Sequence, residues 1–416
     1  MAEVSSHTEE CAESFPSWLS REYFESVVRE KLCDDSIVIT RIDVAPAAEK
    51  GEHFLCAIYR IQLEYKRAED SDAQRVSYVV KARFENKENQ TLNDALETQD
   101  VLGREMFMYS SVLPKLSSIL ADIGQKAQLV PEIIRVDYRK GCIIFEDLCY
   151  RRFKMCDKMV GLDLEHIKLA LKRLAAFNAA AAKLNEIEEG SLQKFNRCCF
   201  SDSGLEPFFT SQMEACGRAV QKWKGFEGYG DKLLALAPKI MEYGRRLFEP
   251  KSHHFNTLIH GDFWINNMMF RYDANDQPIE NVLIDFQFNS WTSPAIDLHY
   301  FLKTSVNEDL KWDHEQELVR YYHNHLAEDL NALQFKGRIP TFQDFWSQFL
   351  DNSFNEVTSV CIVVPLILNE QKSDSADLLE NDDNTMKSKE AVYNQTRIKT
   401  IIQKHLPSFD KRGLLD

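Results

Sequence analysis

The sequence predicts an α+β protein of two lobes, a small β-rich lobe at the N-terminal end and a larger, mainly α-helical lobe after it. Three segments with strand patterns occupy the first hundred residues, and the spacing of apolar residues becomes helical from about residue 163. A group of polar side chains at residues 260–287 accompanies two further apolar runs. We expect lobes at residues 1–147 and 148–416, with the active site in the cleft between them.

The first lobe carries a lysine that the strand pattern turns toward the interior. Strands are predicted at residues 37–39, 54–65 and 76–84. Because side chains alternate between the two faces of a strand, Lys81 shares its face with Ser77 and Val79, which are small or apolar. The alternative is a lysine in solvent on an edge strand, since lysine is rarely buried without a partner.

A partner for Lys81 is predicted in residues 102–109, where the apolar spacing is helical. Glu105 would lie on the turn that faces the sheet. Its ion pair with Lys81 would hold the lysine against the phosphates of a nucleotide. A glutamate on a helix is otherwise often a solvated charge, so the prediction for Glu105 depends on the prediction for Lys81.

An apolar strand at residues 141–145 runs into Glu146, Asp147 and Leu148 and then into a basic stretch. A connector between two lobes has free backbone groups. We therefore expect the main chain at Glu146 and Leu148 to meet the adenine of a nucleotide, with Phe145 closing the pocket. The alternative is a surface strand end with solvated acids, which the spacing does not exclude.

The polar group at residues 260–287 has the side chains that phosphoryl transfer requires. Asp262 and Asn267 lie five residues apart, and Asp285 closes a second apolar run after a turn-rich segment at 272–278. If the two runs form an antiparallel hairpin, Asn267 and Asp285 lie at the same end of it. Their oxygens suit Mg²⁺, and Asp262 can orient a hydroxyl or receive its proton. The alternative is a chance Asp/Asn loop beside an ordinary hairpin.

These residues, in this order, carry a resemblance. The chain resembles the choline and aminoglycoside kinase branch of the protein-kinase-like superfamily through Lys81, Glu105, Glu146-Asp147-Leu148, His260-Gly261-Asp262 with Asn267, and Asp285-Phe286-Gln287. More narrowly, it resembles the insect ecdysteroid-kinase-like family through His-Gly-Asp-Phe-Trp-Ile-Asn-Asn, the Ile-Asp-Phe-Gln strand end, Ser-Pro-Ala-Ile-Asp-Leu and the terminal Lys-Arg-Gly-Leu-Leu-Asp. The resemblance runs from about residue 51 to the C-terminus.

The resemblance implies a protein-kinase-like fold and phosphorylation of a small-molecule alcohol with ATP and Mg²⁺. Asp262 would be the catalytic base or orienting carboxylate. Asn267 and Asp285 would be the magnesium ligands, and Lys81 would bind phosphate with Glu105 as its partner. The acceptor would be an ecdysteroid or another secondary alcohol, including plant or xenobiotic compounds, which suggests a role in detoxification or hormone metabolism.

Supporting roles and departures complete the comparison with the family. Asp297 would accept backbone hydrogen bonds that fix the catalytic loop, and His260 would pack and hydrogen-bond in that loop. The loop over the phosphates has one glycine, Gly51, which we expect against the nucleotide. Cys56 stands where resembling sequences place a small hydroxyl residue, and a thiol is a poorer donor. Asn178 stands where the family often has histidine.

The spacing speaks against a protein kinase. Eleven residues separate Asp285 from Asp297, which leaves no room for a long activation segment. Gly261 stands where a protein kinase has an arginine. Two alternatives remain open beside the ecdysteroid-type kinase. One is a choline- or aminoglycoside-type kinase with a cationic acceptor. The other is a pseudokinase that binds a small ligand without catalysis, which Cys56 and the short phosphate loop favour.

Composition limits the possible partners. The formal net charge of −15 speaks against nucleic acid, whose phosphates bind to basic surfaces. The first ten residues lack the pattern of a signal peptide, and Pro365 interrupts the longest apolar run at 357–368. Ten cysteines without a C-x-x-C pair suggest reduced thiols. We expect a cytoplasmic protein with no nucleic-acid, membrane or protein partner.

The second lobe is predicted to be largely helical. Helices are expected at residues 163–184, 211–223, 232–248, 310–326 and 342–364. Its aromatic residues either wall an acceptor pocket or form plain core, and the second reading is favoured at helical spacing. These residues are Phe208, Phe209, Trp223, Trp312, Phe345 and Trp346.

Overall fold

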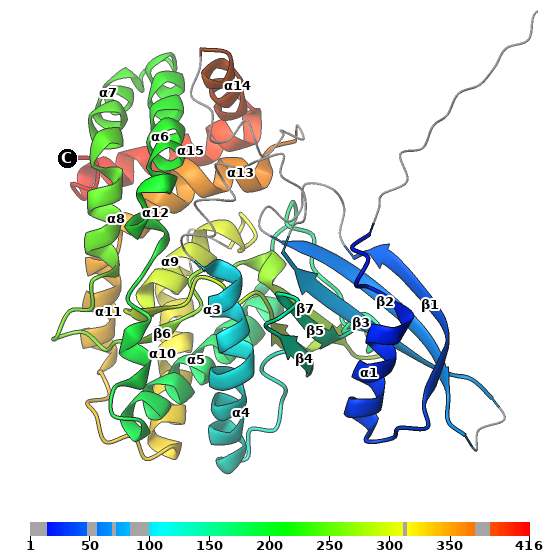
Figure 1. The fold of residues 1–416 in the computed structure, drawn as a ribbon. Coiled ribbons are helices and arrows are strands. Elements are labelled where there is room, and N and C mark those ends of the chain that lie inside the picture. The colour runs from blue at the N-terminus through cyan, green and yellow to red at the C-terminus, as the bar shows by residue number, and fades with distance from the viewer. Residues whose placement is uncertain (1–14, 48–55, 69–71, 84–99, 311–313, 371–382) are drawn as a thin grey trace, which may run out of the picture.

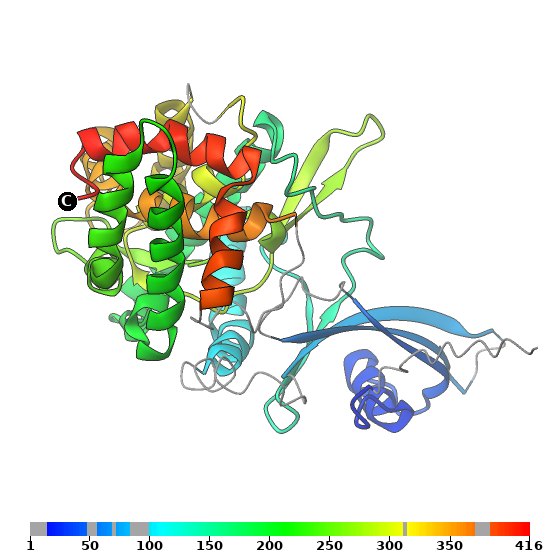
Figure 2. The same ribbon diagram turned by 90° about the horizontal axis from the view of Figure 1, so that it is seen from above.

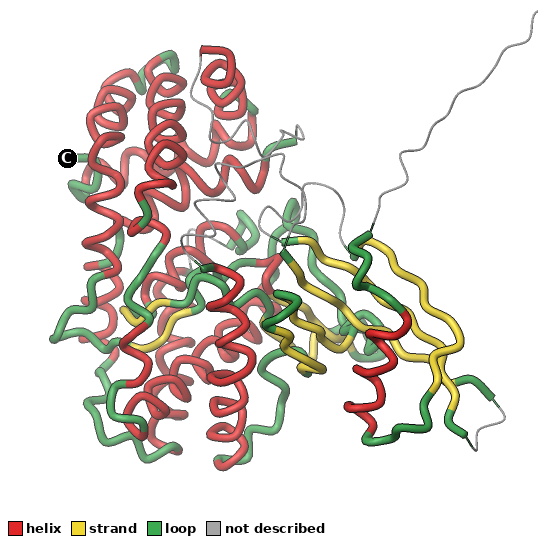
Figure 3. The backbone as a smooth tube through the Cα atoms, in the orientation of Figure 1, coloured by secondary structure: helices red, strands yellow, loops and turns green. Residues whose placement is uncertain are grey.

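The computed structural model describes residues 15–47, 56–68, 72–83, 100–310, 314–370 and 383–416. An antiparallel sheet forms in the N-terminal region, and the C-terminal region is helical (Figure 1). With the strands in yellow and the helices in red, Figure 3 shows the five-stranded sheet on one side of the molecule and most helices on the other. The predicted α+β class is confirmed.

The sheet has five strands in the order β1-β2-β3-β5-β4, and every neighbouring pair is antiparallel. The strands are β1 (Val38–Pro46), β2 (Ala57–Lys66), β3 (Gln74–Ala82), β4 (Ile133–Asp137) and β5 (Cys142–Glu146). Helix α1 (Arg21–Leu32) covers one face, where Phe24 packs with Tyr78 and Val80 of β3. Lys81, the next residue, therefore points to the opposite face, as the alternation predicts.

That opposite face belongs to the largest hydrophobic core of the protein. Two helices follow β3 in the chain, α3 (Val101–Phe107) and α4 (Leu113–Asp122), with a π-helical turn between them at Met108–Val112. Helix α4 packs against α5 (Leu164–Ile187). The core runs from Ile143 and Phe145 of the sheet to Leu171 and Leu174 of α5. The sheet and the helical region are thus joined by continuous packing.

The helical region surrounds α5 and contains a second core. Its other helices are α6 (Glu206–Gln221), α7 (Glu227–Leu236), α8 (Ile240–Phe248), α9 (Ala295–Thr304), α10 (Glu315–Ala332), α11 (Phe342–Asp351), α12 (Phe354–Thr358), α13 (Val364–Leu368), α14 (Asp383–Tyr393) and α15 (Thr396–Lys411). The second core joins α6, α14 and α15, which lie side by side in Figure 2. No helix of the described residues is both long and apolar enough to cross a membrane.

Two helices predicted from the sequence are divided in the structure. The segment at 232–248 forms α7 and α8, separated by a 3₁₀ turn at Ala237–Lys239 that contains Pro238. Proline lacks the backbone N–H that a continuous helix needs. The segment at 342–364 breaks at Asn352, which caps the end of α11, and α12 begins at Phe354.

Two small antiparallel ribbons carry the polar segment at 260–287. Strand β6 (Thr257–Ile259) pairs with β9 (Ser290–Thr292). Strands β7 (Met268–Tyr272) and β8 (Pro278–Leu283) form the predicted hairpin, with Met268 opposite Leu283. The N–H of Ile284 donates to the carbonyl oxygen of Asn267 at 3.0 Å. The residues just outside the paired strands, Asn267 and Asp285, therefore lie at the same end of the hairpin.

Candidate active site

The lysine of β3 lies between two carboxylates from distant parts of the chain. The Lys81 ammonium is 2.7 Å from a carboxylate oxygen of Glu105 in α3, and it donates to the carboxylate of Asp285 after β8. Burial lowers the pKa of Lys81, but the two carboxylates outweigh burial and hold that pKa well above its usual value. Lys81 is therefore a buried, charged lysine, and its position agrees with the predicted ion pair.

Glu105 is the most deeply buried member of this group, with 1% of its surface exposed. Burial raises the pKa of Glu105 to about 7, and the charge of Lys81 opposes the rise. The ionised form of Glu105 thus depends on Lys81. The structure brings these two residues together although 24 positions of sequence separate them.

Asp285 has an unusual backbone conformation. Its φ is +69°, in the left-handed region that residues with a side chain rarely adopt. The residue lies two positions after the end of β8, and its carboxylate accepts a hydrogen bond from Lys81 of the sheet. Such strained residues are concentrated at functional sites, where the surrounding structure holds them in place.

Asp262 and Asn267 are linked directly. The side-chain amide of Asn267 donates to the carbonyl oxygen of Asp262 at 2.9 Å and to its carboxylate Oδ2 at 2.8 Å. Burial and the nearby charge of Asp285 raise the pKa of Asp262 to about 7, while the hydrogen bonds to its carboxylate lower it. Both amide hydrogens of Asn267 point to Asp262, so the Asn267 side-chain oxygen faces away from that residue.

The loop that carries Asp262 is fixed from α9. One carboxylate oxygen of Asp297 accepts the N–H of His260 at 2.7 Å, and the other accepts the N–H of Gly261 at 2.9 Å. These are the hydrogen bonds expected of Asp297. His260 is fully buried, which lowers its pKa to about 4, and its Nε2 lies 3.0 Å from the carbonyl oxygen of Ile284. A neutral imidazole that donates to this carbonyl joins the loop to the hairpin.

Gly261 has no room for a side chain. Its φ is +82°, and a Cβ atom at this position would lie 2.0 Å from the carbonyl oxygen of Phe288. Any other residue here would have to move the segment after Asp285. The arginine that protein kinases place between the histidine and the aspartate is therefore excluded by contact with the backbone.

The sequence offers no physical reason for an asparagine at position 178. In the structure Asn178 links α5 to β6 and α10. Its amide nitrogen donates to the carbonyl oxygen of Leu258 at 2.9 Å, and its amide oxygen accepts the hydroxyl of Tyr322 at 2.7 Å. Its own carbonyl oxygen accepts the hydroxyl of Thr257 at 2.7 Å. Thr257 and Leu258 belong to β6, which leads into the loop of Asp262, so Asn178 of α5 fixes the strand that precedes this loop.

The connector after β5 has one free backbone donor. The N–H of Glu146 donates to the carbonyl oxygen of Glu132 at 3.0 Å, and the Glu146 carboxylate accepts from Arg151 at 2.9 Å. The N–H of Leu148 has no acceptor within the described part of the chain. An adenine contact at Leu148 thus agrees with the structure, whereas at Glu146 the backbone N–H is already used.

Asp147 holds this connector in place. Its carboxylate accepts the hydroxyl of Ser77 at 2.7 Å, the guanidinium of Arg60 at 2.9 Å and the N–H of Cys149 at 3.0 Å. Ser77 and Arg60 come from β3 and β2. This role of Asp147 could not be predicted from the sequence, because its partners lie at least 70 positions away or in a turn that only the fold reveals.

The expected nucleotide contact at Gly51 and the departure from the family at Cys56 concern the phosphate loop. Gly51 lies outside the described residues. Cys56 is buried beside the ion pair of Lys81 and Glu105, and burial raises the pKa of its thiol to about 12. The thiol is therefore neutral. Cys56 therefore lies next to Lys81, but its thiol is only a weak hydrogen-bond donor for phosphate.

Tyr300 is a site residue that the sequence reasoning missed. Its hydroxyl donates to Oδ1 of Asp262 at 2.9 Å. A signal was present in the chain, because Tyr300 follows Asp297 by three positions and side chains three apart share a face of a helix. Once Asp297 was assigned to the catalytic loop, Tyr300 on the same face of α9 was a candidate for contact with it.

The aromatic residues considered for an acceptor pocket divide between the two cores. Phe209 and Trp223 are buried in the core of α6, and Phe345 is buried in the core around α5. The plain-core reading is confirmed for these three residues. Trp346 is partly buried against the core around α5, and Trp312 lies outside the described residues.

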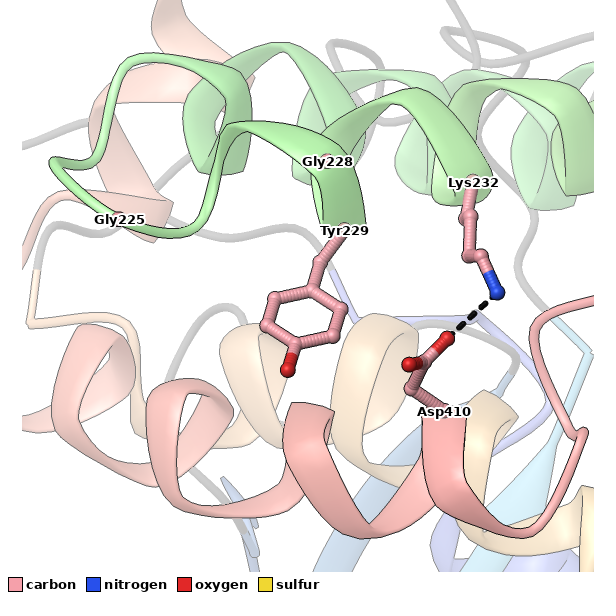
Figure 4. A pocket seen from close by; sticks show the side chains of 5 residues that line it. All are labelled: Gly225, Gly228, Tyr229, Lys232 and Asp410. Carbon is pink, nitrogen blue, oxygen red and sulfur yellow. Dashed lines mark hydrogen bonds and ion pairs between the residues drawn. The ribbon is translucent and has the colours of Figure 1, made fainter.

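A surface hollow lies at the far end of the helical region. Gly225, Gly228, Tyr229, Lys232 and Asp410 line it, and the Lys232 ammonium is 2.6 Å from Asp410 (Figure 4). None of the residues predicted for the active site belongs to this lining. The hollow is therefore separate from the group formed by Lys81, Asp262 and Asp285.

Comparison with known proteins identifies the family. A model described as the ecdysteroid kinase-like family matches residues 50–335. No curated protein matches. Among solved structures, a glucosamine kinase in one crystal form is 14% identical, covers 94% of this chain and 79% of its own, and has a TM-score of 0.26. The same enzyme in a second crystal form is 13% identical, covers 94% of this chain and 82% of its own, and has a TM-score of 0.27.

A third solved structure, a glucosamine kinase in complex with glucosamine, ADP and inorganic phosphate, is 11% identical over 91% of this chain and 92% of its own, with a TM-score of 0.21. At such TM-scores the structural matches support no further conclusion. The family model, by contrast, matches more than half of the chain. The chain therefore belongs to the ecdysteroid kinase-like family.

Proposed function

We propose that this protein is a small-molecule kinase that transfers the γ-phosphoryl group of ATP to an alcohol, with Mg²⁺ as cofactor. The observation that carries the proposal is the contact of Lys81 with both Glu105 and Asp285. A buried lysine held between a helix carboxylate and the acid after the hairpin is the arrangement that positions nucleotide phosphates in kinases. Family membership supports the same activity.

The metal site would be formed by Asn267 and Asp285. Both offer hard oxygen atoms, which Mg²⁺ prefers, and they lie at one end of the β7–β8 hairpin. The amide nitrogen of Asn267 is already directed to Asp262, which leaves its oxygen as the donor. When bound there, Mg²⁺ would neutralise charge on the transferred phosphoryl group.

The protein groups would act in a simple sequence. Lys81 binds the phosphates, and the N–H of Leu148 holds the adenine. Asp262 accepts a hydrogen bond from the acceptor hydroxyl and orients it toward the γ-phosphorus. The hydroxyl oxygen forms the new bond to phosphorus, the bond to the bridging oxygen of ADP breaks, and the hydroxyl proton passes to Asp262 and then to water.

We infer that the acceptor is an ecdysteroid or a similar secondary alcohol, because the family model that matches this chain is described as ecdysteroid kinase-like. The test is to incubate the protein with ATP, Mg²⁺ and separate acceptors, namely ecdysteroids, plant phenolic glycosides, choline and an aminoglycoside, and to measure product mass. A phosphate added to an ecdysteroid, and absent with Asp262→Asn, supports the proposal.

Other products decide between the alternatives. A phosphate on choline or on the aminoglycoside, with none on any ecdysteroid, would replace the proposed acceptor with a cationic one. Magnesium-dependent ATP binding without any product would leave a kinase whose acceptor is missing from the panel. Failure to bind ATP at all would favour the pseudokinase.

A further inference from the structure

Both oxygens of the Asp262 carboxylate receive a hydrogen bond from the protein. The Tyr300 hydroxyl donates to Oδ1 at 2.9 Å, and the Asn267 amide donates to Oδ2 at 2.8 Å. One donor on each oxygen fixes the rotation of the carboxylate about its side-chain bond. Since each carboxylate oxygen can accept two hydrogen bonds, an acceptor hydroxyl can still bind.

The donor Tyr300 sits on a helix that holds the catalytic loop at three points. Asp297 near the start of α9 accepts from the backbone of His260 and Gly261. Tyr300 follows one turn later and contacts Asp262. Ser305, which caps the C-terminal end of α9, accepts the N–H of Ile265 at 2.9 Å. The loop and its carboxylate are therefore placed by one rigid element.

The opposite side of α9 is anchored as well. Lys303 lies 3.2 Å from Glu356 of α12, and His299 lies 3.4 Å from the same carboxylate. Both terminal guanidinium nitrogens of Arg412, near the C-terminus, donate hydrogen bonds to the carboxylate oxygens of Glu356, at 2.9 and 3.0 Å. The helix that carries Tyr300 is thus held in place by ion pairs and hydrogen bonds on its other side.

We propose that Tyr300 is a positioning residue for phosphoryl transfer, which holds the Asp262 carboxylate in the rotation that faces the acceptor hydroxyl. The proposal rests on the proposed function, because it assigns Tyr300 a task in that reaction. Its action is exerted through Asp262. A loss of the hydroxyl should therefore slow the transfer step and leave nucleotide binding as it is.

The experiment compares Tyr300→Phe with Tyr393→Phe, measuring kcat and KM with ATP, Mg²⁺ and an ecdysteroid. Tyr393 is the control, because its hydroxyl also donates within the protein, lying 2.9 and 2.8 Å from the carbonyl oxygens of Gln212 and Cys361. Tyr300→Phe is expected to lower kcat by roughly 10- to 100-fold, the scale of a misplaced catalytic group. KM for ATP is expected to change by less than about twofold. Tyr393→Phe is expected to keep kcat.

A double variant tests whether Tyr300 acts through Asp262. Adding Tyr300→Phe to Asp262→Asn should cause no further loss of the residual turnover, since residues that act as a unit are not additive. An unchanged kcat in Tyr300→Phe would overturn the proposal, as would an equal fall in Tyr393→Phe or a further loss in the double variant.

Failure of the proposed function gives a different result. Wild-type protein that transfers no phosphate to any acceptor and binds no ATP would remove that function, and the role of Tyr300 with it. Wild-type turnover with an unaffected Tyr300→Phe variant would overturn the positioning role alone.

Discussion

The Asn267 side chain donates to the carbonyl oxygen and to the carboxylate of Asp262, at 2.9 and 2.8 Å. One amide therefore joins the two ends of the catalytic loop and turns its own oxygen away from Asp262. The side chain proposed as a metal ligand, Asn267, therefore also holds the proposed base, Asp262. A change at Asn267 should disturb both.

Asn267→Ala is expected to lower kcat and to raise the Mg²⁺ concentration that gives half-maximal activity, each by about tenfold or more. The reason is the loss of a metal oxygen together with a support of Asp262. A magnesium titration of initial rates measures both effects. Asn256→Ala is the control, because its amide donates to the carbonyl oxygen of Lys251, in the turn before β6, and not to Asp262. An unaltered magnesium requirement in Asn267→Ala would show that the metal is held elsewhere.

Lys81→Met is expected to reduce kcat/KM for ATP by roughly 100- to 1,000-fold, because a charge directed at the phosphates is lost. Glu105→Gln should cause a smaller loss, since Lys81 keeps Asp285 as a partner. Steady-state kinetics and ATP titration calorimetry measure the two effects. Lys115→Met removes an exposed ion pair with Glu188 and should leave the kinetics unchanged. If Lys81→Met behaves like Lys115→Met, Lys81 does not bind the nucleotide.

Gly261→Ala is expected to destabilise the protein by roughly 3–5 kcal/mol, because left-handed strain and overpacking add. The new methyl group would lie 2.0 Å from the carbonyl oxygen of Phe288. Gly124→Ala is the matched control, since Gly124 has a φ of +80° with no atom within 4 Å of the added carbon. Its cost should be only about 1 kcal/mol. Urea unfolding compares the two, and equal costs would contradict the contact with Phe288.

Glu356→Gln is expected to lower stability at neutral pH by about 3–5 kcal/mol, because Lys303 and Arg412 lose a buried partner. Burial raises the pKa of Glu356, but Lys303, His299 and Arg412 outweigh burial and hold it at about 2. The folded-state pKa is thus below the ordinary value of 4.5. The contribution of these ion pairs is present above that value and is lost as the pH falls toward 2.

Urea unfolding of wild-type protein and Glu356→Gln at pH 7, 5, 4 and 3.5 tests this sign. The difference in unfolding free energy should be constant from pH 7 to 5 and should shrink below that. Glu188→Gln, at an exposed ion pair, should change stability by less than about 1 kcal/mol at each pH. A difference that grows on acidification would contradict the assigned shift.

The sequence predicts those parts of the site that follow from local periodicity. The period of two in β3 places Lys81 opposite the α1 face, and two apolar runs around a turn give the β7–β8 hairpin. The hairpin register then brings Asn267 and Asp285 to one end. The class of the fold follows from strands early and helices late in the chain.

Contacts between side chains far apart in the chain are what the sequence could not supply. Tyr300 reaches Asp262 across 38 positions, and Ser77 reaches Asp147 across 70. The pair of Ser77 and Asp147 has no periodic signal, and the helical spacing of Tyr300 indicates only that it shares a face with Asp297. Both contacts depend on how β3, α9 and the loops come together. The break at Pro238 is different, since a proline inside the predicted helix at 232–248 was a local sign of two helices.

The most direct test of the account is to measure ATP affinity and phosphoryl transfer to an ecdysteroid together, in wild-type protein and in Asp262→Asn. We expect the wild type to form a phosphorylated steroid. In the variant, turnover should fall by about 1,000-fold or more, with ATP affinity within about twofold of the wild type. Equal turnover in the two proteins would contradict the role of Asp262, and with it the mechanism.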